Sequence, residues 1–541
     1  MARKQHPQSA GSADFYIKLL PTLLTMMSVL AASPARAAGT PGGAVPKIVV
    51  NILVDQLRTD YLEAFMPLYG DDGFKRLLRD GVVYTNADYP LAQPDIASAA
   101  ATIASGTAPS SHGVVGRMWL DRETLRPTFC VDDAQYAGTG GTTDHSSARC
   151  LNVSTISDEL KAAGEDKPLV FAIAPSREAA ILTAGHAANS AVWIDDKTGR
   201  WSSTNYYGGL PAWASVRNTL GTIGDISKTE WRPCSDLVGN FSYFLSGGVK
   251  KPFAHKFKGD SRFADYKTSA LVNEEVNAAA QSCINSTMMG ADPVTDYLAI
   301  TYYAGRYAGQ TESASPMELQ DTYVRLDRAL AELIATLDKK AGIDNVLLVL
   351  TSSGYAAEPA ADLSRYRIPT GTFDMKRVAA LLNMYLVAIY GQGQFVEACY
   401  GTQIYLDHKL IEKGQFNLAE MLERSQDFLM QLEGVKDVYT SRRLLQGAWT
   451  PGISKIRGGY NPRVSGDILI EVASGWQYTD GQSTKKNPVR ESYIPYPIIF
   501  FGAGLKASTT DTAVTTDRIA PTLSKAMRIR APNACSSAPL F

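Results

Sequence analysis

Residues 47–56 read Lys-Ile-Val-Val-Asn-Ile-Leu-Val-Asp-Gln, an almost wholly apolar run that stops at two polar side chains. Runs of this length and composition are typical of strands buried on both faces of a parallel sheet. In such sheets, ligands bind at the carboxyl ends of the strands. The sequence therefore predicts a central strand here, with Asp55 at the edge where a ligand would lie.

The same alternation of apolar runs and helical stretches continues along the chain. Further strands are predicted at residues 82–84, 169–174, 297–303, 346–351 and 498–501, and a long amphipathic helix at residues 321–339. Strands that alternate with helices indicate an α/β fold with a doubly wound, mostly parallel sheet and helices on both of its faces.

Two stretches depart from this alternation. Residues 195–290 are rich in Trp, Tyr, Gly and Ser with weak periodicity, which predicts an inserted cap region. Residues 400–475 predict a second α+β region, with strands at 403–406, 435–439 and 467–472 and a helix at 418–432. Both belong to one domain that extends over residues 47–541.

The N-terminal segment predicts export. An apolar run at residues 19–32 follows basic residues and precedes Ala35-Arg-Ala37, so we expect a signal peptide over residues 1–38 that is cleaved near Ala37. The run is shorter than the roughly 20 residues that a membrane anchor needs. Residues 39–46 form a flexible lead-in, and the mature protein is predicted to be periplasmic or secreted, with no transmembrane segment.

Charge and cysteine content narrow the partners and the compartment. The 53 basic and 54 acidic residues nearly balance, so nothing indicates a nucleic-acid partner. Six cysteines fit an oxidising compartment and allow up to three disulfides, with Cys130 and Cys150 the most plausible local pair. None lies in a Cys-x-x-Cys spacing, so no zinc or redox motif is indicated.

Several segments in a fixed order resemble a known family. They are the strand with Asp55-Gln56, the helix at residues 73–81, Ser105-Gly-Thr-Ala-Pro-Ser-Ser-His-Gly-Val114, residues 177–188, residues 321–327, and residues 459–467 with Gly475-Trp476. Together they resemble the PafA-type alkaline phosphatases, in the type I phosphodiesterase/nucleotide pyrophosphatase branch of the alkaline phosphatase superfamily. The resemblance covers residues 47–525 and implies an alkaline-phosphatase-like fold.

The resemblance also implies a catalytic set. In this family three carboxylates and three histidines hold two zinc ions, a Thr or Ser at a helix N-terminus attacks phosphorus, and an Asn, a Lys and an Arg bind the phosphoryl oxygens. One metal lowers the pKa of the nucleophile and the other stabilises the leaving oxygen. Asp55 falls on the first ligand position and is the one retained ligand.

Most of the other positions carry different chemistry here. The nucleophile position falls on Ile96, which cannot attack; its neighbours Asp95 and Ser98 could act only after a shift in register, and Asp95 also fits a plain helix N-cap. The Asn position falls on Arg117, and Arg177 keeps the family Arg, so both are predicted to bind an anion. The lost ligand positions are Arg306, Gln310, Ser353, Gly354 and, in the least secure alignment, Lys486.

The histidine count supports this interpretation. Only six histidines are present, and none lies in a His-x-His, His-x3-His or Asp-x3-His spacing. We therefore expect no metal, and we hypothesise that Arg306 or Lys486 pairs with Asp55 in place of zinc, because an unpaired buried carboxylate is costly.

Three functions follow as hypotheses. The first is a pseudoenzyme that lacks the two-zinc site and serves a binding, scaffold or regulatory role, with a periplasmic or envelope protein or a small anion as partner. The alternative is a phosphate or sulfate ester hydrolase with a rebuilt site, which would need zinc. A third is an anion or glycan sensor that uses the pocket and the aromatic residues Trp193, Trp201, Tyr206, Tyr207 and Trp213, although core packing is their simpler explanation.

Overall fold

The structure is a computed structural model that describes residues 45–541, except 221–222, 224–225, 239–251, 309–315, 357–368, 448–449, 481–485 and 490–493. The predicted signal peptide therefore lies outside the described residues. Within those residues, no helix is both long and apolar enough to cross a membrane.

A large mixed sheet organises the main domain. Its centre is four parallel neighbours in the order β12 (Val346–Ser352), β1 (Ile48–Asp55), β11 (Asp296–Tyr303) and β6 (Val170–Ala174). On one side β20 (Tyr496–Gly502) runs antiparallel to β12 and to β2 (Val82–Asp88), which pairs with β21 (Ser508–Thr510) and β22 (Val514–Thr515). On the other side follow β7 (Ser190–Ile194), β8 (Trp201–Thr204) and β5 (Gly138–Thr139). The predicted mostly parallel α/β sheet is confirmed.

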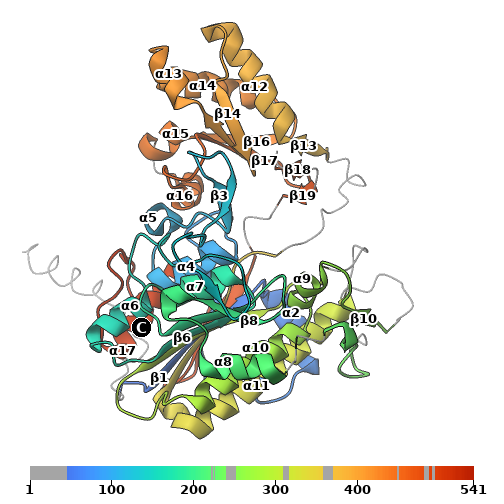
Figure 1. The fold of residues 1–541 in the computed structure, drawn as a ribbon, viewed down its shortest axis with the longest axis vertical. Coiled ribbons are helices and arrows are strands. Elements are labelled where there is room, and N and C mark those ends of the chain that lie inside the picture. The colour runs from blue at the N-terminus through green and yellow to red at the C-terminus, as the bar shows by residue number, and fades with distance from the viewer. Residues whose placement is uncertain are drawn as a thin grey trace, which may run out of the picture. The chain divides into compact units, whose positions relative to one another are not determined.

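Helices cover both faces of this sheet, as predicted (Figure 1). One face carries α3 (Phe74–Asp80), α8 (Ala212–Leu220), α10 (Leu271–Ser286) and α11 (Pro316–Ala341); the other carries α4 (Ile96–Ser105), α6 (Ile156–Ala163), α7 (Arg177–Ala184) and α17 (Ile519–Met527). The apolar run that opens the domain explains this: Ile48, Val50 and Ile52 pack in one core with Leu326 and Leu330 of α11. All of β1 except Asp55 is buried.

The region at residues 195–290 is partly built into this core. Strand β8 extends the central sheet, and α10 packs against α11. The predicted aromatic set is mostly core: Trp193, Trp201, Tyr207 and Trp213 are buried. The remaining elements here are α9 (Arg262–Lys267) and the short ladder of β9 (Glu230–Trp231) with β10 (His255–Lys256).

A second sheet, in the order β14-β15-β17-β16, forms the α+β region expected around residues 400–475. Its strands are Val396–Tyr400, Gln403–Leu406, Ile468–Val472 and Val435–Thr440, and they share an apolar core with α12 (Met375–Tyr390) and α14 (Leu418–Leu429). A three-stranded sheet is formed by β13 (Thr372–Asp374), which precedes the second sheet along the chain, and by β18 (Gln477–Thr479) and β19 (Lys486–Pro488), which follow it. Short helices α13 (His408–Lys413), α15 (Ser441–Gln446) and α16 (Pro451–Gly458) complete the region.

A hairpin of the main domain is tied to this second region. Strands β3 (Met118–Leu120) and β4 (Pro127–Phe129) flank a turn from which Arg122 reaches Asp467, at 3.4 Å, and the Ser465 carbonyl, at 2.6 Å. His408 also contacts Asp467, at 2.9 Å. The Asp467 carboxylate thus joins elements far apart in the sequence.

All six cysteines are free thiols, so the disulfide expected between Cys130 and Cys150 is not present in the structure. Burial raises the pKa of the Cys130 thiol well above its usual range and that of Cys150 to about 12. Both groups are therefore protonated at neutral pH, and a thiol is a poor nucleophile for disulfide exchange.

Candidate functional site

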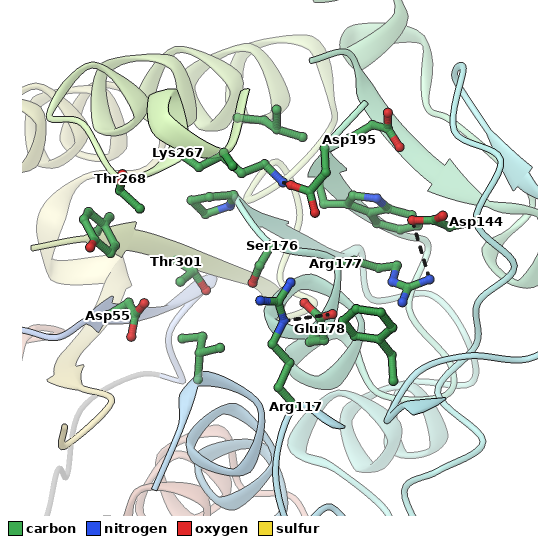
Figure 2. Close-up of a pocket in the computed structure, with 18 of the residues that line it drawn as sticks. Asp55, Arg117, Asp144, Ser176, Arg177, Glu178, Asp195, Lys267, Thr268 and Thr301 are labelled. Carbon is green, nitrogen blue, oxygen red and sulfur yellow. Dashed lines mark hydrogen bonds and ion pairs between the residues drawn. The ribbon is translucent and has the colours of Figure 1, made fainter. Parts of the chain in front are cut away.

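The carboxyl ends of four neighbouring parallel strands meet at one edge of the sheet. Asp55 ends β1, Ser353 and Gly354 follow β12, Arg306 follows β11, and Arg177 opens the helix after β6. The register places Asp55 opposite Tyr303 of β11. A cavity of about 1120 Å³ opens at this edge (Figure 2). Of the residues that the sequence singled out for the site, Asp55, Ile96, Arg117 and Arg177 line this cavity.

Asp55 is held by a hydroxyl. Its Oδ1 accepts a hydrogen bond of 2.8 Å from Ser353 Oγ, which in turn accepts one of 2.8 Å from the Gln56 backbone N–H. Gln56 has a left-handed φ of 65°, so the chain turns sharply just after the carboxylate. Ser353, which the resemblance assigned to a lost ligand position, thus binds the Asp55 carboxylate in this structure.

The structure does not test the proposed pairing of Asp55 with Arg306 or Lys486. Arg306 is half-buried and its carbonyl accepts a 2.6 Å bond from the Tyr303 hydroxyl, while Lys486 begins β19. Neither is among the described residues that line the cavity. Gln310 lies outside the described residues. Pairing of Asp55 with a cation therefore remains a prediction.

Gly354 stands in a space that is already occupied. It has a φ of 72°, and a Cβ added there would lie 2.5 Å from Cδ2 and 2.6 Å from Cε2 of Tyr89. The Tyr89 ring is buried and its hydroxyl donates a 2.7 Å bond to the Ser352 carbonyl. The space beside Gly354 is therefore filled by the Tyr89 ring, and a side chain could enter only if that ring moved.

The nucleophile position carries an apolar side chain at the start of a helix. Ile96 is the first residue of α4, is 8% exposed and lines the cavity. Asp95 is the N-cap of α4: its Oδ1 accepts from Ser98 N and Oγ, both at 2.9 Å, and its Oδ2 accepts from Arg117 N at 2.6 Å. Ser98 is fully buried. In this arrangement Asp95 and Ser98 stabilise the helix start.

Arg117 and Arg177 reach the same cavity, but each already has an anionic partner (Figure 2). Arg117 Nε lies 3.3 Å from Glu178 Oε1. Arg177 donates to Asp132 at 2.8 Å and lies 3.6 Å from Asp144. The two guanidinium carbons lie 5.3 and 5.0 Å from the centre of the Phe129 ring.

Sequence reasoning missed the carboxylates of the cavity other than Asp55. Glu178 follows Arg177 in the first turn of α7, and its side chain is 2% exposed. Asp132 comes from the loop after β4, Asp144 from the loop after β5, and Lys267 from the end of α9. An acidic residue in a first helical turn is ordinary, so the sequence carried no signal that Glu178 would be buried.

The described residues at this edge do not supply the donor set of a two-zinc site. No group of three or more His, Cys, Asp or Glu side chains able to hold a metal occurs in the described part of the chain. The residues beside Asp55 explain this lack of metal ligands. They are a serine, which binds the Asp55 carboxylate, and a glycine, which supplies no side-chain ligand. His145 lines the cavity but has no second imidazole with it among the described lining residues.

Comparison with known proteins identifies the family. The type I phosphodiesterase / nucleotide pyrophosphatase family matches residues 49–494. The chain is 28% identical to alkaline phosphatase PafA of Elizabethkingia meningoseptica (92% of this chain, 94% of the relative) and 30% identical to alkaline phosphatase PhoV of Synechococcus elongatus (90% and 91%). The crystal structure of wild-type PafA superposes with a TM-score of 0.79 at 27% identity, covering 91% of this chain and 98% of that one. The chain therefore belongs to the type I phosphodiesterase / nucleotide pyrophosphatase family and has the fold of the PafA-type alkaline phosphatases.

Proposed function

We propose that this protein is an exported member of the family that binds a ligand in its cavity and does not hydrolyse phosphate esters through two zinc ions. The supporting observation is the composition of the sheet edge. Ile96 stands at the start of α4, and the Tyr89 ring fills the space beside Gly354. The role is then binding, scaffolding or regulation, with a periplasmic or envelope protein as a partner.

A second candidate function is hydrolysis of phosphate or sulfate esters by a rebuilt site. Its support is the comparison itself, since PafA and PhoV are named alkaline phosphatases and match over at least 90% of this chain. By sequence similarity alone, this second function is favoured over the first. Asp55 and Arg177 are retained at family positions and both line the cavity. The donor set described above is what favours the non-hydrolytic proposal.

Metal content and turnover separate the two. The mature protein, purified without chelator and dialysed against zinc, is analysed for bound metal and assayed with aryl phosphate monoesters, diesters and aryl sulfates. The non-hydrolytic proposal expects no stoichiometric zinc and no turnover above the Asp55→Ala variant. About two zinc ions per chain, or turnover that Asp55→Ala abolishes, would refute it in favour of the hydrolase.

Export is part of the proposal and has its own test. The full chain, expressed in a bacterial host, is expected in the periplasmic or medium fraction with a new N-terminus near Ala38. Mass spectrometry of the purified protein reads this N-terminus directly. A product that keeps residues 1–38 in the cytosolic fraction would overturn the assignment.

A further inference from the structure

One buried carboxylate is shared by two basic side chains from different parts of the chain. The Asp467 side chain is 6% exposed and directly precedes β17. Its Oδ1 lies 2.9 Å from Nε2 of His408, at the start of α13. Both of its oxygens lie 3.4 Å from the guanidinium of Arg122, in the turn of the β3–β4 hairpin. The group is neutral overall when His408 is neutral, and it carries one excess positive charge when His408 is protonated.

The contact of Asp467 with Arg122 is the weaker of the two. Hydrogen bonds between a guanidinium and a carboxylate are normally about 2.7–2.9 Å long, and both of the Arg122 contacts are longer. The shortest hydrogen bond of Arg122, at 2.6 Å, goes to the uncharged carbonyl of Ser465. The attraction between Arg122 and Asp467 therefore depends on charge more than on bond geometry, and a further positive charge beside Asp467 weakens it.

A proton on His408 supplies such a charge. The hydrogen bond to Asp467 raises the pKa of His408 above its ordinary 6.5, and Glu412 of α13 acts in the same direction. Burial and the charge of Arg122 lower the pKa of His408 and only partly offset this rise. These three side chains are the charged groups that face His408 in the described part of the chain. Coupling between two sites is reciprocal, so a proton on His408 weakens the attachment of Arg122 by the same free energy with which Arg122 opposes that proton.

The two contacts of Asp467 respond to pH in opposite directions. Because the pKa of His408 is raised in the folded state, its contact with Asp467 stabilises fully below the ordinary pKa and loses this effect as pH rises through the raised value. The contact of Arg122 is strongest above that value and weakens as His408 takes up a proton. The His408 side chain is 44% exposed, so the proton comes directly from solvent.

Arg122 holds a hairpin whose two ends reach the cavity. Arg117 directly precedes β3 and Phe129 ends β4, and both residues line the cavity. The backbone N–H of Cys130 donates to the Arg117 carbonyl at 3.0 Å, which joins the two ends. The backbone N–H of Arg117 also donates to Asp95. Loss of the Arg122 contacts thus frees the turn of the hairpin, while its base stays attached to the main domain.

We propose that His408 is a pH switch that sets how firmly the β3–β4 hairpin is attached to the second region. Neutral His408 leaves the charge of Asp467 to Arg122, and the hairpin is attached. Protonated His408 takes over Asp467, and the hairpin opens more often. None of these three residues is among the described residues that line the cavity, so the switch operates whether the cavity binds a ligand or hydrolyses an ester.

Hydrogen exchange of the mature protein tests this at about pH 5.5 and about pH 8.5, on either side of the titration of a histidine. Mass spectrometry reads peptides from residues 117–130, and the rates are corrected for the intrinsic pH dependence of amide exchange. We expect the opening constant of these amides to be about fivefold higher at the lower pH, which is the low end of typical coupling between sites. An opening constant that does not depend on pH would overturn the proposal.

Two histidine variants assign the effect to one residue. His408→Gln keeps a side chain that can donate to Asp467 but takes up no proton, so the difference between the two pH values should disappear. His145→Gln is the matched control, because it removes an exposed histidine in the loop after β5 and leaves the Asp467 contacts in place. The difference should remain in this control. If it persists in His408→Gln, or disappears in His145→Gln, His408 is not the switch.

The reciprocal measurement is the pKa of His408 itself, read by nuclear magnetic resonance on protein with labelled histidine. Arg122→Met keeps an unbranched stem beside the Tyr405 ring and removes the charge, so the pKa of His408 should rise. An unchanged or lower pKa in this variant would show that Arg122 and His408 are not coupled, and would refute the switch. Stoichiometric zinc with turnover refutes the proposed function alone and leaves the switch standing.

Discussion

Replacement of Gly354 by Ala measures how little room the structure leaves for a side chain at this position. A Cβ at this position would approach the Tyr89 ring to 2.5 Å, and the backbone has a φ of 72°. An L-residue in the left-handed region costs about 1–2 kcal/mol, and overpacking against a buried ring costs about 1–3 kcal/mol. We therefore expect Gly354→Ala to lower the free energy of unfolding by about 2–5 kcal/mol.

Urea denaturation measures this as a lower midpoint with an unchanged slope. Gly208→Ala is the matched control, because Gly208 has a φ of 79° but nothing within 4 Å of an added Cβ. It should show the backbone contribution alone, so the two variants should differ by about 1–3 kcal/mol. Adding Tyr89→Leu should recover much of that difference in a double-mutant cycle. If Gly354→Ala is no more destabilising than Gly208→Ala, the position has room for a ligand and the reasoning is wrong.

Three further predictions concern single side chains. Ser353→Ala removes a buried hydroxyl that bonds both a carboxylate and a backbone N–H, and should lower the unfolding free energy by about 1–3 kcal/mol in the same assay. Arg117→Asn leaves the buried carboxylate of Glu178 without its cation; it should lower stability by about 1–3 kcal/mol, and adding Glu178→Gln should restore part of this. The hydrogen bond to Asp158 raises the pKa of His186 above its ordinary 6.5. Burial would raise the pKa of Asp158, but the contact with His186 lowers the pKa of Asp158 below its ordinary 3.8. The destabilisation by His186→Gln should therefore be greatest between about pH 4 and 6.5. It should become smaller as the pH rises through the raised pKa of His186, and also as the pH falls through the lowered pKa of Asp158. A difference in midpoint that does not depend on pH would contradict this.

The strands of the central sheet were predictable because burial on both faces demands continuous apolar runs. The predicted strand at residues 346–351 appears as β12, Val346–Ser352, and the run at 47–54 appears as β1, Ile48–Asp55. Their parallel pairing then fixes which polar residues meet, which is why Asp55 and Ser353 lie together as their positions implied. The antiparallel direction of β20 could not be predicted from its composition, because a buried strand is apolar whichever way it runs.

The electrostatics of the site were not predictable from the same pattern. The sequence predicted that Arg117 and Arg177 share one site, but it did not predict their partners. The contacts of Arg117 with Glu178 and of Arg177 with Asp132 form only in the folded structure. Lys267 enters the cavity from α9, within a region of weak periodicity. A cationic residue at a family position therefore indicated an anion site, whereas its neighbours in the structure are carboxylates.

These neighbours change what the substitution at residue 117 means. The Nε atom of Arg117 lies 3.3 Å from the carboxylate of Glu178, which is 2% exposed and which no other described cation contacts within 4.0 Å. The free-energy cost of leaving the buried Glu178 carboxylate without a cation is larger than the cost of leaving an exposed arginine without an anion. Pairing with Arg117 therefore mainly stabilises Glu178. Arg117 is thus best explained as the counter-ion of Glu178.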